Sequence, residues 1–454
     1  MAMPHARAVV GRRGHLAVGI ALAVAVWCAV PSAQRMGYAP EEFTARRERL
    51  AKVLQRGTLV MSGASSAVPG LRFRQDHDFF YLTGNESLNA TLVMDVATGE
   101  AHVFLPKLSA ADVRYEGGNW LQETNAARTR GFASIQPLDA LQDFLARRRD
   151  ASGPHTLWTR LSEPDTVNGG RDDVAHDLSR RRMNPLLQFP TENTLRVASL
   201  RERFPQHDVQ DVTPHLDRLR LHKTPGEIDI LRANGRISAE AMRRAIEATS
   251  PGRFEYELEA EATHWLFRHG MQAVAYPAIV GSGPMGNQWH YEDNGRQMKP
   301  GELVVMDYAG SLDYLTVDIT RTWPVSGRFT DAQRRGYLTV LEAQKALIAS
   351  IRPGVTREAA RKVAEDVFRS RGFDPRFAYL GHYVGLSVHD VGDWSLPFEA
   401  GMVMAIEPIL DLPEAQMHIR VEDTILVTPT GTEILTTGVP KEADELLALI
   451  KAAQ

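Results

Sequence analysis

The sequence predicts an α+β protein in which a smaller α/β domain precedes a larger domain of helices packed on a largely antiparallel sheet. Two observations predict this plan. Short apolar strands mix with helical segments up to about residue 205, and hairpin patterns follow two long helices in the second half. The 454 residues, 43% hydrophobic and 24% charged, are enough for two or three domains. The formal net charge of −4 gives no sign of nucleic-acid binding.

The N-terminus has the order of features of a secretory signal. Basic residues precede an apolar run at 16–30, and the small residues Ser32 and Ala33 follow it. The run is too short for a comfortable transmembrane helix. We therefore expect residues 1–33 to be a signal peptide of a periplasmic or secreted protein, with an uncleaved anchor as the alternative. The single cysteine, Cys28, lies in this run, so a mature chain could form no disulfide.

Residues 36–205 are predicted to form the smaller α/β domain. An amphipathic, charge-rich pattern predicts a helix over 41–54. Three short apolar or β-branched runs predict strands, at 59–61, 91–95 and 102–105. The segment contains no self-contained catalytic cluster. Its charged run from Arg72 to Asp78 is interpreted as a polar strand edge or a subunit contact.

The second domain, 216–454, is expected to follow a boundary near 212–223. Thr224 is a plausible N-cap, Pro225 stands at the first helical position, and Glu227 completes a capping box. Further helices are expected after Pro251-Gly252 and near 331–351 and 357–371. From about residue 278 the remaining pattern is one of strands and hairpins.

The first hairpin carries two aspartates. An apolar run at 303–306 ends at Asp307, and the returning strand, 315–323, contains Asp318. In a simple antiparallel hairpin, the midpoint between facing residues lies in the turn, and here it falls at 312.5. We therefore expect the two carboxylates to face each other and to project from the same side.

The second hairpin repeats this construction with two glutamates. An apolar run at 402–406 ends at Glu407, and the returning strand, 419–427, carries Glu422. Their midpoint, 414.5, again falls in the turn. Arg420 lies two residues before Glu422 and hence on the same strand face.

Two mirrored pairs of carboxylates require nearby positive charge to balance them. Like charges directly opposite each other destabilise a sheet, and buried carboxylates must be paired, protonated or metal-bound. Four converging carboxylates would suit two divalent cations of hard or borderline character, such as Mn²⁺, Co²⁺ or Zn²⁺. One of the nearby histidines, His290, His382 and His389, could complete a metal shell, and the others could donate to a substrate carbonyl. Read singly, each acid would be a solvated strand residue.

At these residues the sequence resembles the pita-bread metallopeptidases and, within them, the aminopeptidase P family. The matching stretches, in order, are 73–84 (FRQDHDFFYLTG), 290–294 (HYEDN), 318–322 (DITRT), 388–392 (VHDVG), 401–408 (GMVMAIEP) and 420–423 (RVED). Together they are highly specific. The first of them resembles aminopeptidase P more than prolidase, and it argues against methionine aminopeptidase.

The resemblance implies a pita-bread fold, a curved antiparallel sheet covered by helices with pseudo-two-fold symmetry, after a creatinase- or aminopeptidase P-like N-terminal domain. It implies that Asp307 binds one metal, that His382 and Glu407 bind the other, and that Asp318 and Glu422 bridge them. The expected activity is hydrolysis of the bond between an N-terminal residue and a following proline, by a hydroxide bridging two metals. Glu407 would take and relay a proton.

Three further positions follow from the resemblance. The family's substrate-binding histidines fall on His290 and His389, either of which would hydrogen-bond the developing oxyanion. The arginine of its pattern, expected at the substrate, falls on Arg420. The sequence departs from the pattern at Ala378 and Ile409, both expected near the substrate pocket, so that these two bear on specificity.

The expected cofactors are two divalent ions per subunit, Mn²⁺ first and Co²⁺ or Zn²⁺ as alternatives. The expected partners are peptides with proline second and further copies of the chain in a dimer or tetramer, with no nucleic acid. Prolidase, an Xaa-Pro dipeptidase, is one alternative function. A non-catalytic pita-bread module that binds peptides or proteins is another, although such modules typically lose metal ligands and here all five are present.

Overall fold

The computed structural model describes residues 37–68, 71–148 and 155–453. These belong to one compact unit, 35–454. The predicted signal peptide and Cys28 lie outside the described residues. Within the described ranges, no helix combines the length and the apolar character needed to cross a membrane.

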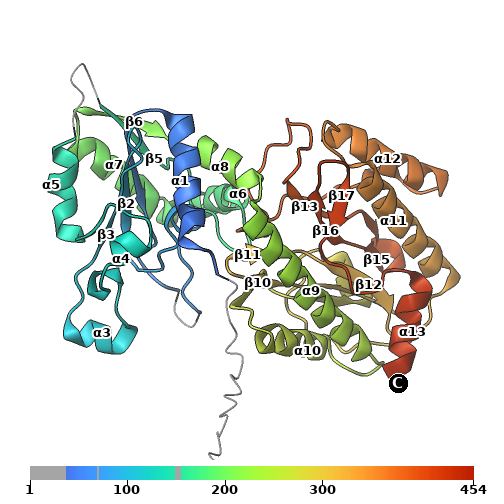
Figure 1. The fold of residues 1–454 in the computed structure, drawn as a ribbon. Coiled ribbons are helices and arrows are strands. Elements are labelled where there is room, and N and C mark those ends of the chain that lie inside the picture. The colour runs from blue at the N-terminus through green and yellow to red at the C-terminus, as the bar shows by residue number, and fades with distance from the viewer. Residues whose placement is uncertain (1–36, 69–70, 149–154, 454) are drawn as a thin grey trace, which may run out of the picture. The chain divides into compact units, whose positions relative to one another are not determined.

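A six-stranded mixed sheet organises the first part of the described chain (Figure 1). Its strands, in spatial order, are β4 (Ser134–Pro137), β3 (Ala101–Leu105), β2 (Thr91–Asp95), β1 (Thr58–Ser62), β5 (His155–Thr159) and β6 (His207–Asp211). The strand β1 pairs antiparallel with β2 and parallel with β5. The three strands predicted from apolar runs correspond to β1, β2 and β3, and these predictions are confirmed.

The same part of the described chain contains seven helices. They are α1 (Pro40–Leu54), α2 (His77–Thr83), α3 (Ala110–Glu116), α4 (Ala126–Thr129), α5 (Leu141–Ala146), α6 (Arg171–Arg182) and α7 (Glu192–Arg203), with short 3₁₀ turns η1 (Trp120–Gln122), η2 (Leu138–Ala140) and η3 (Pro185–Leu187). The helix predicted over 41–54 is confirmed by α1. Its first position is Pro40, whose fixed φ and missing N–H suit a helix start.

The interpretation of the charged run 72–78 as a strand edge is wrong. Asp76 is the N-cap of α2, where its side chain accepts a hydrogen bond from the Phe79 N–H. His77 and Asp78 are buried in the first turn. The capping aspartate favours a helix at this point, and buried partners within the chain compensate the charges.

Two helices link this part to the rest of the chain. The helix α8 (Thr213–Leu221) is followed directly by α9 (Pro225–Glu247). The Thr224 side chain accepts from the Glu227 N–H, and the Glu227 side chain accepts from the Thr224 N–H. The predicted capping box is confirmed, whereas the domain limits 36–205 and 216–454 stay predictions.

Helices and antiparallel strands make up the second half. The helices are α10 (Glu255–Arg268), α11 (Asp331–Ser350), α12 (Arg357–Ser370) and α13 (Ala443–Ala453), of which the first three match predicted helices. The strands are β7 (Ala273–Val274), β8 (Ile279–Ser282), β9 (Leu303–Asp307), β10 (Gly310–Leu312), β11 (Leu315–Thr316), β12 (Thr320–Pro324), β13 (Val403–Ile406), β14 (Ile409–Leu412), β15 (Met417–Arg420), β16 (Asp423–Val427) and β17 (Thr432–Ile434). The short 3₁₀ turns η4 (Gly283–Asn287), η5 (Pro375–Phe377) and η6 (Pro413–Ala415) connect them.

The strands pair as predicted, antiparallel, in sheets ordered β11-β10-β7, β12-β9-β8, β13-β16-β17 and β14-β15. The helix α9 packs against β10 and β11, and α11 packs against β13 and β15 (Figure 1). Strands of both acidic hairpins therefore pack against helices.

The first acidic hairpin differs from its predicted register by two residues. Asp307 pairs with Thr320, and Asp318 lies between β11 and β12. The turn consists of Asp313 and Tyr314, both with positive φ (46° and 71°), as in a two-residue type I′ turn. A shift by two residues keeps every side chain on the same face, so Asp307 and Asp318 still share one side of the hairpin.

The second acidic hairpin keeps the predicted register. Ile406 pairs with Asp423, and Ile409 pairs with Arg420. The same register between these pairs places Glu407 opposite Glu422. Glu422 itself lies in the break between β15 and β16.

Candidate metal and substrate site

Three of the predicted ligand residues converge most closely. One side-chain ligand atom from each of Asp318, His382 and Glu422 lies within 4.8 Å of the others. His382 Nε2 lies 3.3 Å from Asp318 Oδ2 and 3.4 Å from Glu407 Oε1. The two hairpins and the loop carrying His382 thus meet at one point.

Arg420 connects the remaining carboxylate to this group. Its Nη2 donates to Asp307 Oδ2 at 2.7 Å, and its Nη1 lies 4.0 Å from Glu407 Oε2. Arg420 is buried, as are both carboxylates. The five predicted ligands therefore form a connected cluster, in which Arg420 on the second hairpin contacts Asp307 on the first.

Too little positive charge lies near the carboxylates of the cluster to balance their negative charge. Burial raises the pKa of Asp307 to about 8, the charge of Asp318 adds to this effect, and Arg420 opposes it. Burial, followed by the charges of Asp318 and Glu407, raises the pKa of Glu422 well above its ordinary value. Burial also raises the pKa of Glu407. Ionising all of them requires more positive charge than these side chains supply.

His382 and Asp318 form the exception. Burial opposes a charge on His382, but its hydrogen bond to Asp318 and the charge of Glu407 raise its pKa to about 9. Burial opposes a charge on Asp318 as well, but His382 lowers the pKa of this carboxyl to about 2. A metal ion and a proton on His382 would compete for the same carboxylate charge, so that metal binding would release the proton.

The unused oxygens of the cluster fit a divalent cation. Among the described residues, Asp307 Oδ1 and Glu422 Oε1 are buried without a hydrogen-bond partner. The other oxygen of Glu422 accepts from Thr320 Oγ1 at 2.6 Å. Buried acceptors are seldom left unpaired, and carboxylate oxygens with one imidazole are a common donor set for divalent ions. The cluster is therefore a suitable metal site.

A tyrosine and a threonine outside the predicted site hold Asp318 in place. The hydroxyl of buried Tyr276 donates to Asp318 Oδ1 at 2.5 Å. Thr424 Oγ1 accepts from the Asp318 N–H and donates to the Asp318 carbonyl, both at 2.8 Å. The tyrosine stands alone near β7 and carries no recognisable signal. The threonine lies two residues after Glu422, on the same strand face, which was a usable signal.

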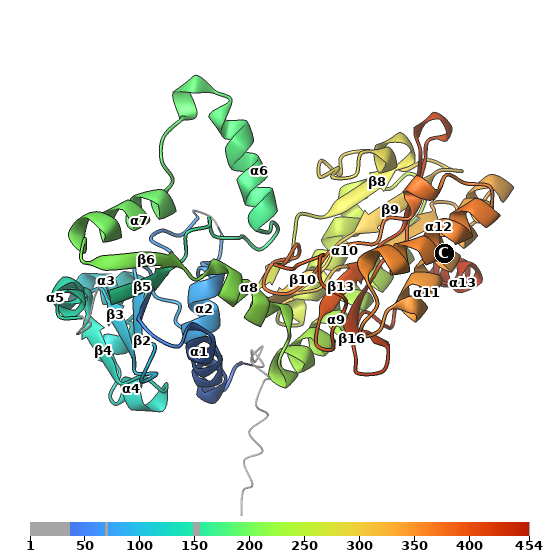
Figure 2. The same cartoon turned by 90° about the horizontal axis from the view of Figure 1, so that it is seen from above.

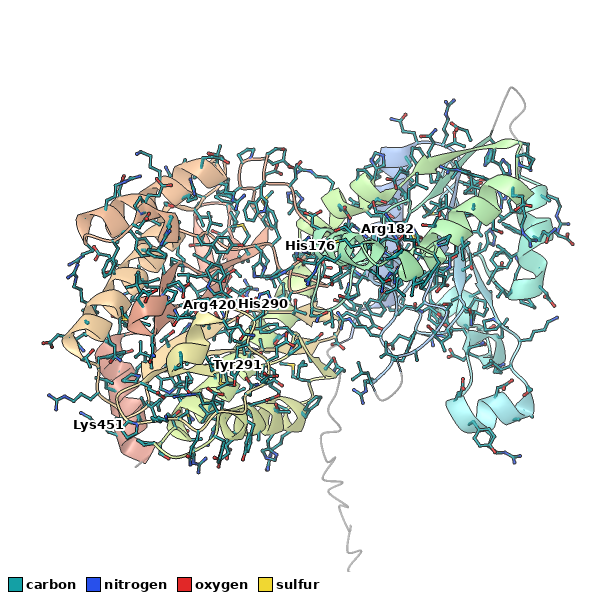
Figure 3. All side chains as sticks on the ribbon, turned by 180° about the vertical axis from the view of Figure 1, so that it is seen from behind. His176, Arg182, His290, Tyr291, Arg420 and Lys451 are labelled. Carbon is teal, nitrogen blue, oxygen red and sulfur yellow. The ribbon has the colours of Figure 1, made fainter. Side chains whose placement is uncertain are left out.

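The two predicted substrate histidines lie beside the cluster. The ring centroids of His389 and His382 are 4.2 Å apart, with the rings tilted by 66°. His290 is exposed in the loop after η4. Desolvation by its surroundings and the charge of Arg420 lower the pKa of His290. Figure 3 labels His290 and Arg420. Their assignment as substrate-binding residues, like that of Arg420, stays a prediction.

Known proteins resemble the chain along most of its length. Residues 43–158 match the N-terminal domain of aminopeptidase P, and residues 229–429 match metallopeptidase family M24. The Xaa-Pro aminopeptidase of Escherichia coli (strain K12) is 32% identical over 453 residues, covering 91% of this chain and 98% of that protein. The Xaa-Pro dipeptidase of Rattus norvegicus is 26% identical over 484 residues, with coverages of 89% and 92%.

The fold is shared as well. A structure of E. coli aminopeptidase P with the inhibitor Pro-Leu matches with a TM-score of 0.76 at 29% identity, covering 92% of this chain and 99% of that one. This match confirms the expected pita-bread architecture behind a smaller N-terminal domain. Because the sequence, the fold and the donor set agree, the chain belongs to the Xaa-Pro aminopeptidases of metallopeptidase family M24.

Proposed function

We propose that this protein is a metal-dependent Xaa-Pro aminopeptidase, which hydrolyses the bond between an N-terminal residue and a following proline. The observation that carries the proposal is the buried cluster centred on Asp318, His382 and Glu422, whose carboxylates lack enough positive charge nearby, in a chain that belongs to this family. Membership alone would leave open whether this chain has kept the chemistry. The intact donor set supports catalysis.

Two divalent cations are the proposed cofactors, with Mn²⁺ as the first candidate and Co²⁺ or Zn²⁺ as alternatives. Asp307 would hold one ion, His382 and Glu407 would hold the other, and Asp318 and Glu422 would contact both. When bound, such ions lower the pKa of water and polarise a carbonyl oxygen. The ordinary preferences of carboxylate and imidazole ligands support this choice of metals.

The remaining chemistry falls to side chains of the chain itself. Glu407 would accept a proton from the attacking water and pass it to the leaving nitrogen. His290 and His389 would donate hydrogen bonds to the substrate carbonyl, where negative charge develops. Arg420, proposed to face the substrate, also keeps Asp307 in place. Because proline lacks an N–H, recognition of the second residue must use the ring.

The test is an assay on protein stripped of metal and reloaded with Mn²⁺, Co²⁺ or Zn²⁺ in turn. We expect release of free alanine from Ala-Pro-Ala and none from Ala-Ala-Ala. The variant Glu422→Gln, which keeps the size of the side chain, is the matched inactive control. Failure of the wild-type protein to cleave any Xaa-Pro peptide with any of these ions would refute the proposed function.

A dipeptidase is the second candidate, favoured by the similarity to the rat Xaa-Pro dipeptidase. Comparison of kcat/KM for Ala-Pro and Ala-Pro-Ala separates the two. An aminopeptidase should prefer the longer peptide, whereas strong preference for the dipeptide would favour the prolidase assignment. Binding of both peptides without cleavage would favour a non-catalytic binding module.

We also propose that the protein is exported and that it self-associates. The basic residues, the apolar run 16–30 and the small residues at 32–33 support export. Mass spectrometry of the protein from cell fractions should find an N-terminus after Ser32 or Ala33 in the exported material, whereas an intact Met1 in the membrane fraction would favour the anchor. Light scattering on the purified protein should give the mass of a dimer or tetramer.

A further inference from the structure

We propose that Asp173, on α6, is a positioning residue that orients the substrate histidine His389. This inference rests on the proposed function. His389 Nδ1 lies 2.9 Å from Asp173 Oδ2, across 216 positions of the sequence. A carboxylate can only accept, so the Nδ1–H donates to it. With Nδ1 engaged, Nε2 is the ring nitrogen that remains for the substrate, and it can donate to the substrate carbonyl in the form of the ring that carries both N–H protons.

The Asp173 carboxylate is itself fixed in place. The same Oδ2 accepts a hydrogen bond from the Gly170 N–H at 2.9 Å, across the first turn of α6. The hydrogen bond from His389 lowers the pKa of the Asp173 carboxyl, so the group is ionised near neutral pH. All residues of α6 are described and none of them is buried, and Figure 2 shows the helix standing clear of the six-stranded sheet. The first turn of the helix makes the contact with His389.

The backbone around Asp173 fits closely against the backbone at His389. The Val388 N–H donates to the Val167 carbonyl at 2.9 Å. A Cβ atom at Gly170 would lie only 2.2 Å from the His389 carbonyl oxygen, and this oxygen cannot move aside freely because it belongs to the backbone. Only glycine permits this approach, which brings Asp173 within hydrogen-bond distance of the ring.

Buried ion pairs hold the segment before α6 and the segment around His389 together. Arg220 Nη2 donates to Asp165 Oδ2 and to Asp390 Oδ1, both at 2.6 Å. Asp165 precedes the α6 segment, and Asp390 directly follows His389. Lys223 Nζ adds a contact to Asp390 Oδ2 at 3.2 Å. The separation between Asp173 and His389 is therefore set by a rigid arrangement.

The expected role is that of a carboxylate behind a functional histidine. Such a partner fixes the tautomer and the ring orientation, and its loss typically lowers activity by about 10- to 100-fold. His389 already lies against His382. A free ring could rotate away from the substrate carbonyl, which should affect turnover more than binding of the ground state.

The test is a double-mutant cycle with Asp173→Ala and His389→Ala, measured on Mn²⁺-loaded full-length protein with Ala-Pro-Ala. We expect Asp173→Ala to lower kcat by about 10-fold or more with little change in KM. The double variant should be no slower than His389→Ala alone. Asp172→Asn, an exposed change on the same turn, is the matched control and should match wild type. Asp173→Glu should recover part of kcat.

A second measurement separates positioning from loss of structure and from failure of the proposed function. Nitrogen-15 NMR of histidine-labelled protein should show His389 protonated at Nδ1 in the wild type, and this state should lose its preference in Asp173→Ala. Melting temperature and bound metal should not change. Unchanged kcat in Asp173→Ala, or additive losses in the double variant, would overturn the inference. Inactive wild-type protein would instead refute the proposed function, while the NMR signature still tests the contact.

Discussion

Two buried clusters of charge in this protein differ in their balance. The ligand cluster consists of Asp307, Asp318, His382, Glu407 and Glu422 with Arg420. The arginine network consists of Asp78, Asp165 and Asp390 with Arg160, Arg171 and Arg220. In the network, Asp78 alone accepts hydrogen bonds from all three arginines, at 2.8 to 3.1 Å. The carboxylate side chains of both clusters are buried, so burial does not distinguish them.

The pKa values of the carboxyl groups show the difference. Burial alone would raise the pKa of Asp78, but Arg171 and Arg220 lower it below its ordinary value. Burial is equally severe for Asp307 and Glu422, yet their pKa values are raised, because the nearest charges include other carboxylates. A balanced cluster stabilises its own ionised form, whereas an unbalanced one needs further cations. The imbalance, more than the burial, marks the functional site.

The largest effect is expected from removal of one carboxylate from the ligand cluster. Glu422→Gln should lower kcat/KM by at least about 1,000-fold, because metal ions supply several kcal/mol of transition-state stabilisation. Metal analysis should find less than the wild-type content. Asp139→Asn, in an exposed pair with Lys107, serves as a surface control and should retain full activity. Retained activity in Glu422→Gln would contradict the proposed role of this residue.

Removal of a carboxylate should affect stability differently in the two clusters. Asp78→Asn should lower the free energy of unfolding by about 3–5 kcal/mol, because it leaves buried arginines without their partner. Glu422→Gln should not destabilise the metal-free protein, since it removes an uncompensated charge. Urea unfolding of both variants without metal measures this difference. Equal destabilisation would mean that the two clusters are balanced alike.

Metal should stabilise one cluster and leave the other unchanged. At a free Mn²⁺ concentration 100 times Kd, the wild type should gain about 2.7 kcal/mol in the free energy of unfolding for each ion bound. Asp78→Asn should gain the same increment from its lower starting point, and Glu422→Gln should gain much less. Thermal unfolding with and without Mn²⁺ provides the comparison, and a similar gain in Glu422→Gln would argue against Glu422 as a ligand.

The sequence predicted the ligand cluster better than the arginine network, for a physical reason. Glu407 and Glu422 lie on one hairpin with the predicted register, so their pairing is local. The register at Asp307 was missed by two residues because the turn uses Tyr314 at positive φ, which the residue type does not indicate. Because successive side chains of a strand point to opposite faces, an error of two residues still left Asp307 and Asp318 on the same predicted face.

The contacts that sequence reasoning could not supply are between distant segments. Asp78 meets Arg220 across 142 positions, and His389 meets Asp173 across 216. No periodicity or spacing connects such residues, and each looks like an ordinary surface charge in its local context. Asp78 lies on α2, Arg220 on α8 and Asp173 on α6, and His389 lies in the loop before β13, so that only the folded chain brings them together.

The smallest expected effect is a pH dependence that belongs to the arginine network. The folded-state pKa of Asp78 lies below its ordinary value of 3.8, so this carboxylate contributes stability that is present above about pH 4 and is lost as the pH falls further. Below pH 4 the wild type should therefore lose stability more steeply than Asp78→Asn. The difference in slope should reach at most about 1.4 kcal/mol per pH unit, the value for one proton. Urea unfolding at intervals from pH 3 to pH 6 measures both slopes. Parallel slopes would show that the arginines do not hold Asp78 in its ionised form. The arginine network would then not be the balanced cluster that the proposed contrast requires.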